Sequence, residues 1–206
     1  GELALGSLYA AHGDRDFGNP AWEEAQGRFL VVRLSPFRNV ERSTPHLVLY
    51  REIRDALPGA YVDFSFFPAA RDRAALTSAG IPWLHGVASA RGAADFDAIL
   101  VSNAYTLELV NIVPALVNSG LPARRSERRA GFPIVALGGS NALAAGALCD
   151  PGSGDSYVDA MFFGEGEGSI GRIAAGLAEA AGLAGTARQA SLEALLERFR
   201  SGGVDL

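Results

Sequence analysis

Short apolar runs alternate with helix-like segments along most of the chain. Residues 29–34 are apolar except for Arg33 and are rich in β-branched side chains, and Ser35-Pro36 ends the run, which predicts a buried strand. Similar runs predict further strands over residues 61–67, 97–101, 133–137 and 157–163. Helical spacing of apolar side chains predicts helices over residues 45–57, 72–78, 105–118, from the 164–167 segment to about 181, and 192–199.

This alternation predicts an α/β fold. Strand–helix–strand order is typical of parallel sheets with right-handed crossovers and helices on both faces. We therefore expect a three-layer, flavodoxin-like (Rossmann-like) sandwich around a doubly wound parallel five-stranded sheet, with the strand order left open. Thr44 is expected to cap the first helix and Pro45 to begin it.

The change in character at Arg28 predicts the domain organisation. Residues 1–27 are poorly periodic and are interpreted as an N-terminal arm carrying a short helix. Residues 28–185 are expected to form the α/β domain. Residues 186–206 are expected to hold a C-terminal helix that leads toward a further domain outside this chain.

The composition restricts the class of protein. The chain has 206 residues, of which 49% are hydrophobic and 20% charged, which fits a folded domain and excludes a disordered chain. All 18 basic residues are arginines, so Schiff-base lysines and a phosphate-binding P-loop lysine are excluded within this sequence. The single cysteine excludes a disulfide framework and any cysteine-ligated zinc or iron–sulfur site made by this chain alone.

Charge and hydropathy predict the cellular location of the protein and restrict its classes of partner. The formal net charge of -5 argues against a nucleic-acid partner. No run approaches the ~18 apolar residues of a membrane span, and the first residues lack the basic-then-apolar layout of a signal peptide. We expect a cytoplasmic protein without a membrane or nucleic-acid partner, and the sequence leaves the oligomeric state open.

The residues that follow the predicted strands are the candidate binding residues. In doubly wound sheets, ligands bind outside the carboxyl ends of the strands. Glycine in such a turn lets a flat ring or a phosphate approach backbone N–H groups, although Gly-Gly is also common in plain tight turns. The turns therefore predict a small or nucleotide-like ligand. The candidates are Ser35, Phe37, Arg38, Ser102, Asn103, Tyr105, Gly138, Gly139, Ser140, Gly164, Glu165 and Gly166.

No group of side chains predicts catalysis or metal binding by this chain. His12, His46 and His85 are scattered, and Cys149 has no base near it in the sequence. The arginine-rich segment 124–129 is interpreted as a solvated charge run, with an anion or partner patch as the alternative.

Several motifs occur in a set order along the chain. They include THR-PRO-HIS-LEU at 44–47, DAILVSN at 97–103, GLP at 120–122, PIVALGG at 133–139 and GEGE at 164–167. In this order and spacing, residues 29–173 resemble the N-terminal cobalamin-binding-like domain of radical SAM proteins. The resemblance implies a flavodoxin-like domain that holds cobalamin across the carboxyl ends of its strands. It also implies a radical SAM barrel as the partner in the same protein.

The resemblance places part of the chemistry outside this chain. Barrels of such proteins carry a C-x3-C-x2-C motif for a [4Fe–4S] cluster that cleaves S-adenosylmethionine. With one cysteine, this chain holds neither group, so both are expected only in the missing domain of the parent protein. That parent is expected to be a radical SAM enzyme, with methyl transfer as one candidate reaction.

The resemblance also implies roles for the candidate residues. Residues 138–140 would lie along the nucleotide tail of cobalamin, and residues 164–166 would close the pocket beside it. Residues 102, 103 and 105 would hydrogen-bond the tail or the corrin amides, while residues 37 and 38 would face the lower corrin side.

Cobalt would have no histidine ligand from this chain. Mutases and methionine synthase carry Asp-x-His-x-x-Gly after the first strand, where the histidine ligates cobalt, but residues 35–40 read SPFRNV. Two alternatives stay open. One is a cofactor-free docking scaffold, and the other is a flavodoxin-like domain that binds a nucleotide or phosphate.

Overall fold

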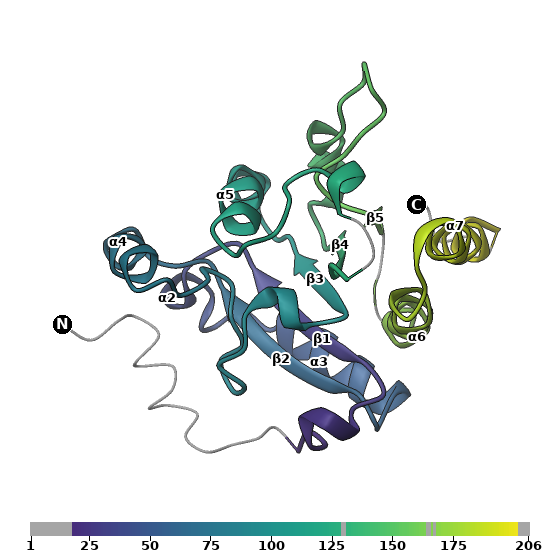
Figure 1. Ribbon diagram of the computed structural model, residues 1–206, viewed down its shortest axis with the longest axis horizontal. Coiled ribbons are helices and arrows are strands. Elements are labelled where there is room, and N and C mark those ends of the chain that lie inside the picture. Colours follow the sequence, from purple (N-terminus) through teal and green to yellow (C-terminus); the bar gives the residue numbers. More distant parts are fainter. Residues whose placement is uncertain (1–17, 129–130, 164–165, 167, 202–206) are drawn as a thin grey trace.

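One parallel sheet forms the centre of the protein (Figure 1). The computed structural model describes residues 18–128, 131–163, 166 and 168–201. The strands are β1 (Arg28–Arg33), β2 (Tyr61–Phe66), β3 (Ala98–Ser102), β4 (Ile134–Gly138) and β5 (Ala160–Met161). Their order is β2-β1-β3-β4-β5 and every pairing is parallel, which confirms the predicted flavodoxin-like α/β fold. The strand order reverses between β1 and β3, because β2 is added on one side of β1 and β3 to β5 are added on the other. The topological switch point therefore lies between β1 and β3.

Helices cover both faces of this sheet (Figure 1). One face carries α3 (Pro45–Ala56), α6 (Ile170–Ala181) and α7 (Gly185–Ser201). The other carries α4 (Ala70–Ser78), α5 (Ile112–Val117) and the 3-10 helix η5 (Ala142–Leu148). The remaining short helices are η1 (Trp22–Glu24), α2 (Phe37–Val40), η2 (Ala93–Asp95), η3 (Thr106–Asn111) and η4 (Arg125–Glu127).

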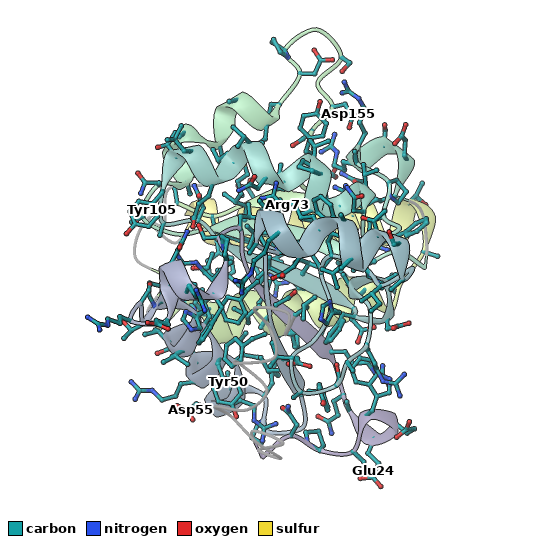
Figure 2. The ribbon with its side chains drawn as sticks, turned by 90° about the vertical axis from the view of Figure 1, so that its left-hand side faces the viewer. Glu24, Tyr50, Asp55, Arg73, Tyr105 and Asp155 are labelled. Atoms are coloured by element: carbon teal, nitrogen blue, oxygen red, sulfur yellow. The ribbon has the colours of Figure 1, made fainter. Side chains whose placement is uncertain are left out.

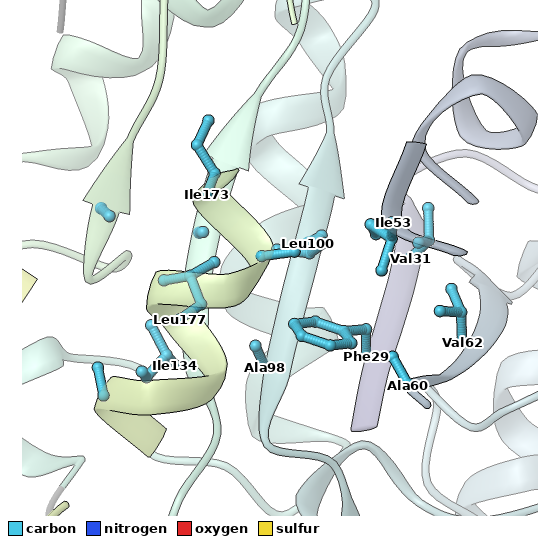
Figure 3. Packing of buried hydrophobic residues seen from close by; sticks show 14 of the residues in the cluster. Phe29, Val31, Ile53, Ala60, Val62, Ala98, Leu100, Ile134, Ile173 and Leu177 are labelled. Atoms are coloured by element: carbon cyan, nitrogen blue, oxygen red, sulfur yellow. The ribbon is translucent and has the colours of Figure 1, made fainter. Parts of the chain in front are cut away.

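Alternation along the strands divides the core into two halves. Phe29 and Val31 of β1 face α3 and α6, where they pack with Leu177 and other apolar side chains (Figure 3). Leu30 and Val32 point to the opposite face, toward α5. Because both faces are buried, the strands read as nearly continuous apolar runs in the sequence.

The α3 and α6 helices touch at Gly171. A Cβ atom built at this position would lie 2.3 Å from the Cβ of Ala56 on α3. A side chain at residue 171 would therefore push α3 and α6 apart, and glycine is required by this close approach.

We expect Gly171→Leu to lower the free energy of unfolding by about 2–3 kcal/mol, because it overpacks the α3–α6 contact. Urea denaturation measures the change. Gly146→Leu is the control, since no atom lies within 4 Å of a Cβ at residue 146, and it should change stability by less than about 0.5 kcal/mol. Equal effects of the two substitutions would contradict the role of the helix contact.

Hydrogen bonds cover the outer edge of β2. The Val87 N–H donates to the Phe64 carbonyl at 2.9 Å, and the buried Asp63 carboxylate accepts two further N–H groups of the same loop at 2.8 and 3.0 Å. The Asn19 side-chain amide pairs with both backbone groups of Val62 at 2.9 Å each. Backbone groups that an edge strand would leave open are thus bonded within the chain.

Several element boundaries differ from the sequence-based expectation. The predicted strand over 157–163 is wrong in length, because only Ala160–Met161 pairs with β4. The predicted helix over 105–118 begins as the 3-10 helix η3 and becomes α-helical only at Ile112. Pro45 begins α3 as expected, but no side chain at Thr44 caps the helix.

The last helix is longer than its apolar pattern predicted. α7 begins at Gly185, and Leu195 packs so closely on α6 that a Cβ at Gly176 would lie 2.4 Å from it. The division of the chain at residue 185 stays a prediction. None of the described helices combines the length and the apolar character that crossing a bilayer requires.

Candidate functional site

A pocket of about 330 Å³ opens at the carboxyl ends of the central strands, on the face that α3 and α6 cover. Leu49 of α3, Leu100 of β3 and Ile173 of α6 contribute to its apolar walls. Hydroxyl-bearing residues also line it, namely Thr44, Ser102, Ser140 and Ser169, and none of the described lining residues is charged. Its size and its mainly apolar lining with a few polar groups are typical of small-molecule sites.

The pocket brings together the predicted residues of β3, β4 and the loop before α6. These are Ser102, Gly138, Gly139, Ser140 and Gly166. They meet because parallel strands end at the same edge of a sheet, so their turns are neighbours in space. Gly164 and Glu165 lie outside the described residues.

The predicted residues Phe37, Arg38 and Tyr105 do not line this pocket. The Phe37 ring packs edge-to-face on Phe66, with ring centroids 5.1 Å apart. Arg38 is exposed, and Tyr105 is 64% exposed and lies at the surface (Figure 2). The bulky side chains that follow β1 and β3 therefore leave the pocket open.

Ser35 belongs to a buried polar cluster that was not predicted. Its hydroxyl donates to Glu108 at 2.5 Å, and a guanidinium nitrogen of Arg33 lies 3.6 Å from the same Glu108 oxygen. Arg33 also donates to the Ser43 hydroxyl at 3.0 Å. The sequence carried one signal for this cluster, since Arg33 interrupts the apolar run of residues 29–34.

The turns after β3 and β4 are joined through Asn103. Its backbone N–H donates to the Gly138 carbonyl at 2.8 Å, and its side-chain nitrogen donates to the Asn141 carbonyl at 3.2 Å. Gly139 has φ +116°, and a Cβ there would lie 2.3 Å from the Asn103 carbonyl oxygen. Contact between the two turns, in addition to any ligand, therefore requires glycine at residue 139.

Asn103 also leaves an acceptor free next to this edge. The residue is fully buried, and its side-chain oxygen has no hydrogen-bond partner among the described residues. A buried polar atom without a partner is costly, so the site favours a donor that is not part of the described chain.

A family model for the N-terminal region of radical SAM proteins matches residues 46–200, which is more than half of the chain. The chain belongs to this family. The matched region contains β3, β4, α6 and nearly all of α3, so it includes most of the pocket. The match confirms the radical SAM part of the resemblance but specifies no cofactor. No curated protein and no solved structure gave a match.

The arginine-rich segment of this radical SAM N-terminal domain contacts its own chain. Arg128 is buried and pairs with Asp159 at 3.2 Å, so the interpretation as a solvated run is wrong for this residue. Arg124 lies 3.9 Å from a carboxylate oxygen of Asp155. The Ser126 hydroxyl donates to Asp155 at 2.6 Å, and this hydrogen bond is the main cause that keeps the pKa of Asp155 below its usual value. Arg129 lies outside the described residues.

Histidine and cysteine side chains of the domain lie away from the pocket. His46 is buried edge-on against Phe64, and His85 Nδ1 lies 2.9 Å from the Pro82 carbonyl oxygen. Cys149 is exposed, and His12 lies outside the described residues. Across the part of the chain that the structure describes, no three His, Cys, Asp or Glu side chains are grouped so that they could hold a metal ion.

Proposed function

We propose that this radical SAM N-terminal domain binds cobalamin without a protein histidine on cobalt and presents it to the radical SAM barrel of the whole protein. The observation that carries the proposal is the apolar pocket at the carboxyl edge, beside the topological switch point where ligands of this fold class bind. When bound, a corrinoid supplies a cobalt centre that can carry a methyl group.

The lining of the pocket suits the nucleotide tail of cobalamin. Leu100, Ala136 and Ile173 offer apolar surface to the faces of a benzimidazole ring. The hydroxyl groups of Ser102 and Ser140 supply hydrogen bonds for the ribose of the tail. In this proposal the chain's own residues bind the tail and exclude water from it.

The corrin ring would then rest on the exposed carboxyl edge. Arg38 and Tyr105 are exposed there, and both can hydrogen-bond the amide side chains of the ring. Neither His46 nor His85 lines the pocket, so the affinity would come from the tail and the amides.

The same edge carries apolar surface for the proposed barrel partner. Tyr105, which directly precedes η3, is 64% exposed, and Leu107 and Val110 of η3 are 81% and 71% exposed. Clustered apolar side chains on a surface are typical of contact sites with another domain.

Titration of the purified chain with hydroxocobalamin tests the binding proposal. We expect corrinoid to remain with the protein after gel filtration, with a visible spectrum that shows no imidazole from the protein on cobalt. Val48→Trp should lower the affinity about tenfold or more, because a large ring at this lining position fills the pocket. Leu47→Trp is the matched control, since Leu47 is 51% exposed and does not line the pocket.

Each other outcome favours a stated alternative. Complete loss of corrinoid from the folded chain at high micromolar concentration would reject the proposal in favour of a docking scaffold. Retention of FMN or another nucleotide in its place would favour a nucleotide-binding domain. Equal effects of Val48→Trp and Leu47→Trp would place the corrinoid elsewhere.

A further inference from the structure

Arg33 places a buried positive charge next to the pocket. It ends β1, where it pairs with Phe66 of β2, and its side chain is 0% exposed. Val32 pairs with Val101 of β3, so continuing the register by one residue sets Arg33 beside Ser102. Because Phe29 and Val31 face α3 and α6, alternation turns Arg33 toward that face as well.

A row of neighbouring positions thus crosses the sheet at its carboxyl edge. Ser102 pairs with Gly138, and both line the pocket, with Arg33 as the next position toward β1. The chain at residues 43–44 contacts both the guanidinium and the pocket. Thr44 lines the pocket, and the adjacent Ser43 accepts the hydrogen bond from Arg33.

The guanidinium has more donors than partners. It carries five N–H groups. One nitrogen bonds Ser43, whereas the other two, Nε and Nη2, have no hydrogen-bond partner among the described residues. Glu108 lies 3.6 Å from Nη2, beyond hydrogen-bond distance. Its carboxylate already accepts the Ser35 hydroxyl and the N–H groups of residues 104 and 105. A buried cation with unused donors calls for a further acceptor.

The N-terminal ends of two helices lie at the pocket. α3 begins at Pro45 and α6 at Ile170, and both residues line the pocket. The N-terminal end of a helix carries the positive end of its dipole and favours anions. The pocket therefore combines apolar walls with two helix N-termini, and the Arg33–Glu108 ion pair lies outside its described lining.

We propose that Arg33 holds an anionic group, of the phosphate class, on the ligand whose apolar ring occupies the pocket. The anion accepts hydrogen bonds from the unused donors on Nε and Nη2 of the guanidinium. In the corrinoid case this inference rests on the proposed function, and the anion is then the phosphodiester that joins the nucleotide tail of cobalamin to the corrin ring.

A matched pair of dyes tests Arg33 without any corrinoid. 1-Anilinonaphthalene-8-sulfonate has two aromatic groups and a sulfonate, and N-phenyl-1-naphthylamine has the same rings without the charge. We expect the sulfonate dye to bind the chain more tightly than the uncharged dye. Val48→Trp should weaken the binding of both dyes, because the tryptophan ring fills the pocket. Arg33→Met should lower the affinity for the sulfonate dye about tenfold or more, because charge-assisted hydrogen bonds are lost. The affinity for the uncharged dye should change by less than about twofold.

Folding of the variants is controlled separately. Arg33→Met leaves the Glu108 carboxylate buried without its cation, so the double variant Arg33→Met/Glu108→Gln is measured as well, with thermal unfolding followed by circular dichroism. Arg51→Met is the control for overall charge, because Arg51 is exposed on α3. If the folded double variant keeps the sulfonate preference, or if Arg51→Met removes it equally, the inference is wrong and water or Ser43 alone satisfies Arg33.

Corrinoids then distinguish the source of the anion. Hydroxocobalamin has the phosphodiester tail, whereas dicyanocobinamide is a corrin without the nucleotide. We expect the double variant to lose affinity for cobalamin about tenfold or more and to keep its affinity for cobinamide. Equal losses for both would overturn the phosphodiester assignment. If the chain without substitutions binds neither corrinoid but still prefers the sulfonate dye, the proposed function fails while the assignment of Arg33 stands.

Discussion

Arg128→Met is expected to lower the free energy of unfolding by about 3–5 kcal/mol, the range for breaking a buried ion pair. The Arg128 side chain is 0% exposed and lies 3.2 Å from an Asp159 oxygen. It also donates to the carbonyl groups of Pro122, Ala123 and Tyr157. Methionine would leave the Asp159 carboxylate and these carbonyl groups with fewer donors. Urea denaturation followed by tryptophan fluorescence measures the loss.

A nearby arginine provides the control for this experiment. Arg125 makes one long hydrogen bond, of 3.4 Å, to the Gly154 carbonyl group in an exposed setting. Arg125→Met should therefore change stability by less than about 0.5 kcal/mol. The double variant Arg128→Met/Asp159→Asn should be more stable than Arg128→Met alone, because it removes the buried carboxylate charge that Arg128 no longer balances. Equal losses for Arg125→Met and Arg128→Met would refute the account of this ion pair.

Gly139→Ala is expected to destabilise the domain by about 2–4 kcal/mol, from a strained φ together with overpacking. The backbone at Gly139 has φ +116°, and the new methyl group would lie 2.3 Å from the Asn103 carbonyl oxygen. The two turns would have to separate at the mouth of the pocket. Thermal unfolding monitored by circular dichroism gives the size of the effect.

The neighbouring glycine separates steric strain from a general effect of the turn. At Gly138 no positive φ occurs, and the nearest atom to a new Cβ is 3.5 Å away, which is ordinary contact. Gly138→Ala should therefore be tolerated to within about 1 kcal/mol. Loss of stability at residue 138 as large as at residue 139 would show that the Asn103 contact is not the cause.

The sheet was predictable because its strands are buried on both faces. Runs such as residues 29–34 are apolar except at Arg33, and turn residues mark their ends. The length of β5 was harder to predict. Tyr157 and Val158 are apolar because they pack in the core on the α5 side of the sheet, and they do not belong to the paired strand. The 3-10 start of η3 was also hidden, because apolar residues recur at similar spacing in both kinds of helix.

The site was predictable only as far as chain topology determines it. Residues after β3 and β4 share the pocket because adjacent parallel strands end together, and this follows from the fold alone. The positions of Phe37 and Tyr105 depend on side-chain packing, which strand ends do not specify. Arg33 was missed because the register and the loop at Ser43 decide its surroundings.

The covered margin of β2 has a consequence for association between molecules. Backbone donors and acceptors on an open margin are a template onto which a foreign extended segment can add, and this is a common start of aggregation. Here the Asn19 amide and the Val87 N–H occupy groups that such a segment would need. Asn19→Ala would uncover Val62 and should make the domain more prone to form β-rich aggregates at high concentration.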